Sequence, residues 1–218
     1  PLQDKITLQP GTNVRIEVVV RTKGIGHKFP GGTIDSNEPW LQVFVQNENG
    51  ETIYGSGLLD GKKFVDQSAH FFRGILLDKQ GEFILKRNPH EWVTTLYNNS
   101  IPPGSAEVIH YEWNVPDNLN GGFKIIANLN YRKFNRRITE TFLDEPIYLP
   151  IVTMASDTVS IVAHPQKLNL KVEDAIRIND YGIGMLRQNN LEAARTAFTR
   201  VTEINPKYAD GYVNLARV

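Results

Sequence analysis

The sequence predicts a mainly β protein: an antiparallel β-sandwich over residues 1–162, followed by a small α-helical hairpin. Many short runs alternate apolar and polar residues, as in Val14–Val20, and this period of two is typical of half-buried strands. Turn signals such as Asn49-Gly50 separate the runs. Beyond residue 171 the apolar residues recur at three- and four-residue steps instead, which is typical of amphipathic helices.

The strand-like runs continue through most of the first 162 residues. We expect strands at 14–20, 40–45, 52–54, 82–86, 92–97, 107–113 and 123–131, with further candidates at 147–152 and 158–162. A helix is the alternative at 67–77. Frequent turns without long intervening helices favour an antiparallel sandwich. Trp40, Trp92 and Trp113 fall in or beside these runs, so we expect them in the core.

The pattern of residues 172–218 predicts helices joined by a turn at Asn189-Asn190, and residues 163–171 are expected to form a linker. The second helix is expected at 191–204, because Pro206 follows it. The motif positions resemble a tetratricopeptide repeat, whose period is about 34 residues. Its small and aromatic positions fall on Gly182, Ala194 and Phe198.

A single repeat of this kind cannot bury its own apolar face. The helical pattern still continues at Val218, where the next repeat would be incomplete. We therefore expect a truncated array: either more repeats follow in a longer natural protein, or the hairpin docks on another surface.

Composition narrows the functional classes. The chain has 218 residues, a formal net charge of zero and no cysteine. A neutral chain offers no electrostatic argument for a nucleic-acid binder, and no apolar run approaches the roughly 18 residues of a membrane span. Without cysteine, this chain forms no disulfide, thiolate metal site or thioether bond to haem.

A glycine-rich loop carries the most distinctive chemistry. The run from Lys23 to Thr33 contains four glycines together with His27 and Phe29. Because glycine permits positive φ and close backbone approach, the loop is suited to lie against a flat ligand. It lacks the Gly-x-x-x-x-Gly-Lys-Ser/Thr pattern and the strand–turn–helix context of a phosphate loop.

The loop lies in the run GIGHKFPGGTIDSNEPWLQVFV, which is followed by YGSG, VDQSAHFFRGILLD, IPPGSAEVIHYEWNVP and NLNYRKFNRR. Together these runs resemble the β-domain of certain multihaem c-type cytochromes, some of which carry tetratricopeptide repeats after it. In that family the domain follows a region rich in Cys-x-x-Cys-His motifs, which this chain lacks. The resemblance implies an electron-transfer protein, periplasmic or extracellular, whose haem c is attached to a preceding segment or a separate chain.

The resemblance makes His27 and His70 candidate axial ligands of haem iron, because a neutral imidazole is a good ligand for it. The glycines around His27 would admit a porphyrin edge, with Phe29 stacking nearby, and Arg73 would meet a propionate. The competing interpretation is a hydrogen-bonded structural or surface histidine. That interpretation is favoured for the remaining three: His90, His110 and His164.

The other charged residues form no recognised site. The basic run 131–137 is interleaved with aromatics and would suit haem propionates or an acidic partner, but a solvated strand end is the favoured interpretation. No calcium-loop spacing occurs among the carboxylates considered, which are Asp35, Glu38, Asp60, Asp66, Asp144 and Glu145. We identify no catalytic residues and leave the question of enzymatic activity open.

Two functions follow from the sequence. The first is the non-haem-attaching portion of a multihaem cytochrome, which covers haems, donates an axial histidine and docks other subunits through its repeat. The alternative is a cofactor-free scaffold for protein interaction. A carbohydrate-binding sandwich has less support, because the tryptophans are expected inside strand runs.

Overall fold

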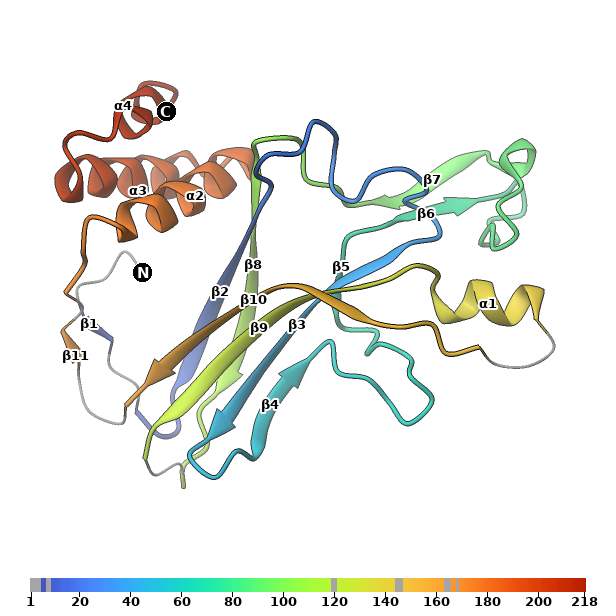
Figure 1. The fold of residues 1–218 in the computed structure, drawn as a ribbon, viewed down its shortest axis with the longest axis horizontal. Coiled ribbons are helices and arrows are strands. Elements are labelled where there is room, and N and C mark those ends of the chain that lie inside the picture. Colours follow the sequence, from blue (N-terminus) through green and yellow to red (C-terminus); the bar gives the residue numbers. More distant parts are fainter. Residues whose placement is uncertain (1–4, 7–8, 119–120, 144–146, 163–165, 168) are drawn as a thin grey trace. The chain divides into compact units, whose positions relative to one another are not determined.

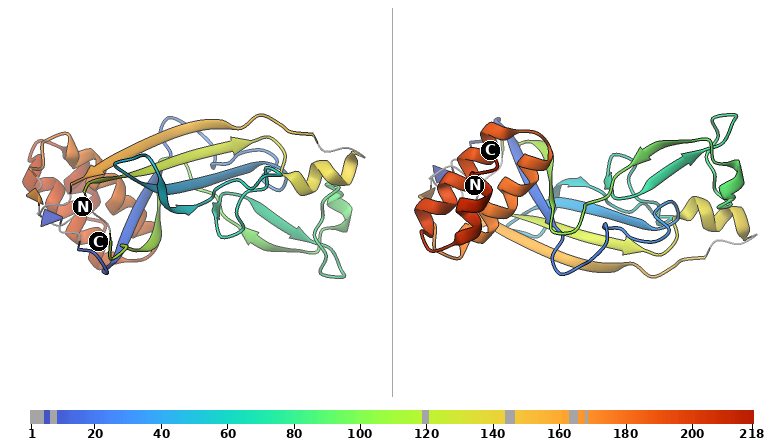
Figure 2. Two further views of the ribbon diagram at one scale, coloured as in Figure 1. Left: turned by 90° about the horizontal axis from the view of Figure 1, so that it is seen from below. Right: turned by 90° about the horizontal axis from the view of Figure 1, so that it is seen from above.

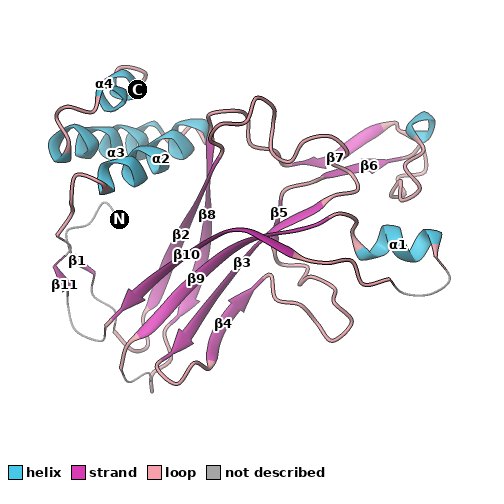
Figure 3. Ribbon diagram, in the orientation of Figure 1, coloured by secondary structure: helices cyan, strands magenta, loops and turns pink. Residues whose placement is uncertain are grey.

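A computed structural model describes residues 5–6, 9–118, 121–143, 147–162, 166–167 and 169–218. The structure is 35% strand, its strand pairs are antiparallel, and helices α2–α4 pack together near the C-terminal end (Figure 3). The predicted fold class is therefore confirmed. Two compact units are described separately: unit 1 within residues 1–27, 101–121 and 162–218, and unit 2 within 28–100 and 122–161. The predicted domain division at residues 162 and 172 stays a prediction.

Unit 2 is built on a five-stranded antiparallel sheet (Figure 1). Its main order is β10 (Val152–Ile161), β9 (Phe123–Arg132), β3 (Glu38–Asn47) and β4 (Thr52–Ser56), and the short β5 (His70–Phe71) also pairs with β3. Strand β3 is central, and Trp40, Val43 and Val45 on it are fully buried. Trp40 packs with Val65 and Phe71 in the core of this unit.

A hairpin and a short helix extend unit 2. Strand β6 (Gly74–Leu77) pairs with β7 (Thr94–Asn98), and the turn η1 (Pro89–Glu91) lies between them in the chain. Helix α1 (Arg136–Phe142) begins where the Asn135 side chain accepts a hydrogen bond from the Ile138 amide. The hairpin (green) and α1 (yellow) lie at the same end of the unit in both views of Figure 2.

Three expectations fail in this part of the chain. Residues 67–77 contain the strands β5 and β6 instead of a helix, because a turn held by Asp66 interrupts the helical spacing. The run 82–86 forms only one bridge, between Phe83 and Leu77. Trp92 follows η1 and is 55% exposed, whereas Trp40 and Trp113 are buried as expected.

Unit 1 combines a two-stranded ribbon with the C-terminal helices. Strand β2 (Asn13–Arg21) pairs with β8 (Ala106–Asn114), and β1 (Lys5–Ile6) pairs with β11 (Gln166–Lys167). The helices are α2 (Asp174–Arg187), α3 (Leu191–Ile204) and α4 (Ala209–Leu215). Helix α3 has the predicted bounds, and it starts at the Asn190 side chain, which accepts from the Ala193 amide.

The helical hairpin docks on the β2–β8 ribbon of its own unit. A Cβ on Gly184 would lie 2.6 Å from Val108 Cγ2, so glycine allows α2 to approach β8 closely. Arg187 forms an ion pair with Glu107 at 3.0 Å, at the end of α2. This contact covers one apolar face of the repeat, and docking of the hairpin was one of the two alternatives that the sequence left open.

The contact between α2 and α3 depends on small residues, as the repeat motif predicts. Ala194 and Ala197 are fully buried on α3, and the Phe198 ring lies against Gly182. A Cβ on Gly182 would come within 2.5 Å of the Phe198 ring. The packing of the two helices therefore needs a residue without a side chain at this position.

We predict that Gly182→Ala destabilises the protein. Alanine favours the helix by about 1 kcal/mol, but overpacking costs about 1–3 kcal/mol, and the buried Phe198 ring has little room to move. Urea unfolding should show a net loss of roughly 1 kcal/mol. Gly61→Ala is the matched control, because its Cβ would meet nothing within 4 Å. A Gly182→Ala variant more stable than the parent protein would contradict this account of the packing.

Candidate functional site

His70 belongs to an aromatic cluster in unit 2. Its ring meets the fully buried Phe72 ring edge-on, with 5.0 Å between the two ring centroids. The centroid of the Phe29 ring lies 5.6 Å from that of Phe72. The Asn99 side-chain amide donates to His70 Nε2 at 2.9 Å and to the Phe71 carbonyl at 3.2 Å. Ligation of iron through His70 Nε2 would therefore require the Asn99 bond to break.

His27 lies in the glycine-rich loop that follows β2, and its side chain is exposed. Gly24 and Gly32 adopt φ of 69° and 66°, in the left-handed region that favours glycine. A Cβ on Gly24, Gly26 or Gly32 would meet no atom within 4 Å. Within the described residues the loop backbone thus has open space beside it. His27 is the last residue of unit 1, whereas Phe29 and His70 belong to unit 2.

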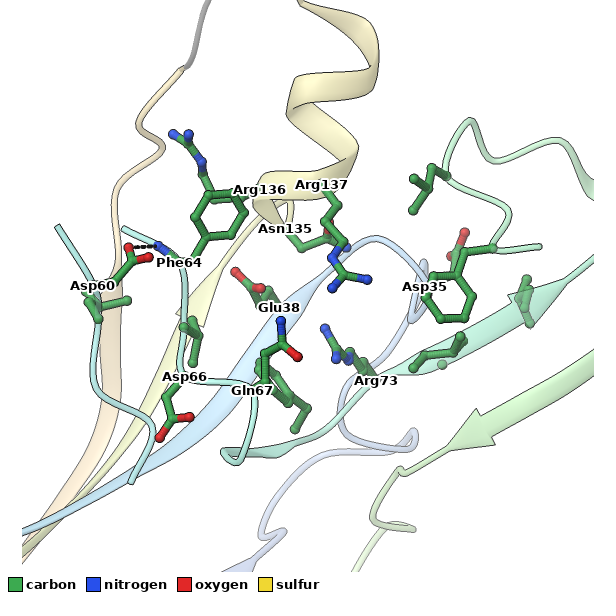
Figure 4. Close-up of a pocket in the computed structure, with 18 of the residues that line it drawn as sticks. Asp35, Glu38, Asp60, Phe64, Asp66, Gln67, Arg73, Asn135, Arg136 and Arg137 are labelled. Carbon is green, nitrogen blue, oxygen red and sulfur yellow. Dashed lines mark hydrogen bonds between the residues drawn. The ribbon is translucent and has the colours of Figure 1, made fainter. Parts of the chain in front are cut away.

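Arg73 follows the aromatic cluster and lines a cavity of about 950 Å³ in unit 2. Its guanidinium carbon lies 3.9 Å from the centroid of the Phe71 ring, and its buried Nε has no hydrogen-bond partner. Burial and the charge of Arg137 lower the pKa of Arg73, while Glu38 opposes the shift. Figure 4 shows Arg73 and Arg137 pointing toward one another across the cavity.

A buried ion pair links two central strands beside this cavity. Glu38 on β3 and Arg132 on β9 are register partners, and both side chains are almost fully buried. Arg132 Nε donates to Glu38 Oε2 at 2.8 Å, its Nη2 contacts the same oxygen, and its Nη1 donates to the Lys63 carbonyl. Burial raises the pKa of Glu38, and the charge and hydrogen bonds of Arg132 work in the opposite direction.

The basic run 131–137 is therefore not a solvated strand end. Arg132 and Arg136 are 1% and 4% exposed, whereas Lys133 and Arg137 are exposed. The run crosses from β9 into α1. Along it, the side chains of Arg132 and Arg136 point into the unit, and those of Lys133 and Arg137 are exposed to solvent. The usable sequence signal was Asn135, because asparagine is a favoured residue at the N-terminal cap of a helix.

Arg136 and Arg137 open helix α1 at the edge of the cavity. The Arg136 guanidinium lies over the rings of Phe64 and Tyr148 and donates from Nη2 to Glu140 at 2.8 Å. Its Nε and Nη1 are buried without a hydrogen-bond partner. Arg137 lies over the Phe83 ring, with 5.9 Å from its guanidinium carbon to the ring centroid.

The carboxylates that line the cavity already have ion-pair or hydrogen-bond partners. Asp35 pairs with Arg87 at 3.5 Å, and Asp60 Oδ1 accepts from two backbone amides at 2.8 Å each. Asp66 accepts from the Ser68 amide at 3.0 Å and from its hydroxyl at 2.9 Å, and the amide is the main reason that the pKa of Asp66 is lowered. Asp144 and Glu145 lie outside the described residues.

The remaining histidines have separate surroundings. His110 on β8 lies 3.3 Å from Glu17 and accepts a hydrogen bond from Arg15, and His90 is exposed in η1. His164 lies outside the described residues. Within the described ranges, no three acidic or histidine side chains gather as a metal site would require, and no helix has both the length and the apolar character to cross a membrane.

Comparisons with known proteins give one informative structural similarity. No protein-family model matches the sequence, and no curated protein does. A penta-haem cytochrome c552 from Thermochromatium tepidum superposes with a TM-score of 0.54 and 19% identity, over 72% of this chain and 38% of the cytochrome. A sporulation control protein, Spo0M from Bacillus subtilis, matches with a TM-score of only 0.25 and 10% identity, over 80% of this chain and 52% of Spo0M.

The fold of this chain thus resembles part of a multihaem cytochrome c. The chain spans well under half of that cytochrome. Because the sequence contains no cysteine, no haem is attached through this chain. At 19% identity the similarity concerns the fold.

We predict that Glu38→Gln and Arg132→Met each destabilise the protein by about 3–5 kcal/mol, because either change leaves a buried group without its counter-charge. The double variant should recover part of the loss, and urea unfolding measures all three. Glu203→Gln is the control, since Glu203 is exposed and its pair with the half-buried Arg200 should contribute only about 0–1 kcal/mol. Strictly additive losses in the double variant would contradict a direct coupling between Glu38 and Arg132.

Asp66 provides a pH prediction. Its pKa is lowered in the folded state, so its ionised form stabilises the fold above the unfolded-state pKa of about 3.9. This stability is lost as the pH falls through the native pKa. In an NMR titration, Ser68→Ala should raise the pKa of Asp66 but leave it below the ordinary value, because the residue 68 amide still donates. An unchanged pKa would show that the hydroxyl contributes nothing.

Proposed function

We propose that this chain is a portion of a multihaem c-type cytochrome that attaches no haem itself and covers haem c bound to other sequence, in the service of electron transfer. The fold similarity to part of a penta-haem cytochrome is the observation that carries the proposal. The lack of cysteine requires the thioether bonds to lie on a preceding segment or another subunit. A periplasmic or extracellular location is proposed on the same resemblance.

The surroundings of His27 fit a haem. An axial ligand needs an accessible imidazole, and a porphyrin edge needs backbone without side chains close to it. His27 is exposed, and Gly24, Gly26 and Gly32 of its loop face open space. His70 fits less well, because Asn99 already donates to its Nε2. We propose His27 as the axial ligand because its side chain is exposed beside open glycine backbone, with Phe29, two residues further along the chain, as the aromatic residue for the ring.

A bound haem would supply an iron that accepts and returns one electron. The contribution of this chain would be the imidazole at His27 and a protein cover that excludes water. Both influence the reduction potential of haem iron, through the axial ligand and through the polarity of the surroundings.

Exposed apolar side chains support docking to further protein. Around the β6–β7 hairpin, Phe83, Trp92, Val93 and Leu96 are 45–65% exposed. Several exposed apolar side chains on one hairpin are a candidate interaction surface. On unit 1, the exposed Tyr212 and Val213 of α4 continue the repeat pattern, so we propose that the helical repeat contacts another subunit.

We test the axial ligand in the native haem-bearing assembly. His27→Ala should convert one low-spin iron to a form with an open axial position, seen as a high-spin signal in electron paramagnetic resonance and a shift of the Soret band. His110→Ala is the control, because this strand histidine is held by Arg15 and Glu17. His70→Ala should leave the low-spin signal unchanged.

Three outcomes would count against the proposal in different ways. A low-spin signal unchanged in His27→Ala would remove His27 as a ligand. A change in His70→Ala instead would move ligation to His70. A native assembly without Soret absorbance would favour the alternative, a cofactor-free scaffold for protein interaction.

A further inference from the structure

The cavity of unit 2 has an unbalanced charge arrangement that does not depend on the proposed haem function. Arg73 reaches it from the segment between β5 and β6, and Arg137 reaches it from the first turn of α1. Figure 4 shows the two guanidinium groups facing one another, with Glu38 and Gln67 to one side. Two cations directed at the same space repel each other unless an anion lies between them.

Among the described residues, no carboxylate forms an ion pair with either of these two arginines. Glu38 is held by Arg132 through two nitrogens. Arg73 Nε is buried without an acceptor. A buried donor without a partner costs free energy, so an external acceptor between the two arginines would relieve both the repulsion and the missing hydrogen bond.

The rest of the cavity is suited to an apolar group. Phe71 lies beneath Arg73, Phe83 lies beneath Arg137, and Phe64 lines the wall toward Arg136. The volume of about 950 Å³ falls in the range of small-molecule sites. An inorganic ion would leave most of this apolar lining uncovered, whereas a ligand with an aromatic or aliphatic body would contact it.

The surrounding charges favour a single negative charge on the ligand. Four carboxylates line the cavity together with three arginines. These carboxylates would repel a doubly charged anion more strongly than a singly charged one. The four carboxylates are Asp35, Glu38, Asp60 and Asp66. A carboxylate is singly charged near neutral pH, and its two oxygens match the planar donors of guanidinium groups.

We propose that this cavity binds a small organic carboxylate, with the carboxylate group between Arg73 and Arg137 and its apolar body against Phe64, Phe71 and Phe83. The ligand is either a free small molecule or a carboxylate-bearing side arm of a group held by neighbouring protein. Arg73 and Arg137 hold and orient the charge, and the aromatic side chains select against anions without an apolar body.

The test uses 3-phenylpropionate as the probe, followed by calorimetry and by NMR signals of the arginine Nε–H groups. We expect saturable binding that shifts the Arg73 and Arg137 signals. Arg137→Gln, on an exposed residue that should not disturb folding, should weaken binding by about tenfold or more, as expected for loss of one charged hydrogen-bond donor. Arg217→Gln, which removes an exposed arginine of unit 1, is the matched control and should bind like the parent protein.

Two further ligands test the two halves of the proposal. The neutral 3-phenylpropionamide should bind much more weakly than 3-phenylpropionate, and inorganic phosphate should compete poorly with it. Arg73→Lys keeps the charge in case Arg73→Gln fails to fold, and it should still weaken binding because it loses the planar donor. Equal binding by Arg137→Gln, equal binding of the amide, or absence of any binding at millimolar probe would overturn the proposal.

The source of the carboxylate is tested in the native assembly with any partner present. If 3-phenylpropionate still binds with the same affinity, the natural ligand is a free small molecule. If the arginine signals are already shifted and the probe no longer binds, the assembly supplies the carboxylate. Unshifted signals together with loss of probe binding would overturn both sources.

Discussion

The buried pair Glu38–Arg132 is the constraint around which unit 2 is arranged. It joins β3 to β9 at the end of their ladder, and Arg132 also holds the segment around Lys63 through its carbonyl. Desolvating two charges is costly unless their bonds are well satisfied. Because the hydrogen bonds of Glu38 go to Arg132, Arg73 and Arg137 face the cavity without an ion pair from the described residues.

In unit 1 the corresponding constraint is the close approach of helix α2 to its neighbours, which glycine residues allow. Gly184 lets α2 contact Val108 on β8, and Gly182 lets it contact Phe198 on α3. One helix thus packs on two different partners through two glycines, Gly182 and Gly184, with one residue between them. Glycine lowers helix propensity, and here the gain in tertiary packing offsets that cost.

The sequence predicted those elements whose local pattern agrees with their tertiary surroundings. Strands β3 and β9 and the bounds of α3 follow from apolar periodicity, the turn at Asn189-Asn190 and Pro206. Strand β10 is one strand, Val152–Ile161, where two separate candidates were expected at 147–152 and 158–162. The pattern failed where tertiary contacts decide. Trp92 sits in an apolar run yet is exposed, and Arg132 sits in a basic run yet is buried, because only the fold shows that Glu38 lies opposite it.

The candidate site could likewise be predicted only where its residues are close together in the sequence. The glycine-rich surroundings of His27 and Phe29 made them candidates, and this stays a prediction. The cavity could not be foreseen, since its arginines come from segments more than sixty residues apart in the chain. Arg73 was singled out for a haem propionate, which is itself a carboxylate on an apolar body. If the proposed function holds, a chain without cysteine would hold such a group without a thioether bond. The affinity would then depend on the imidazole, guanidinium and aromatic groups of the loop and of the cavity.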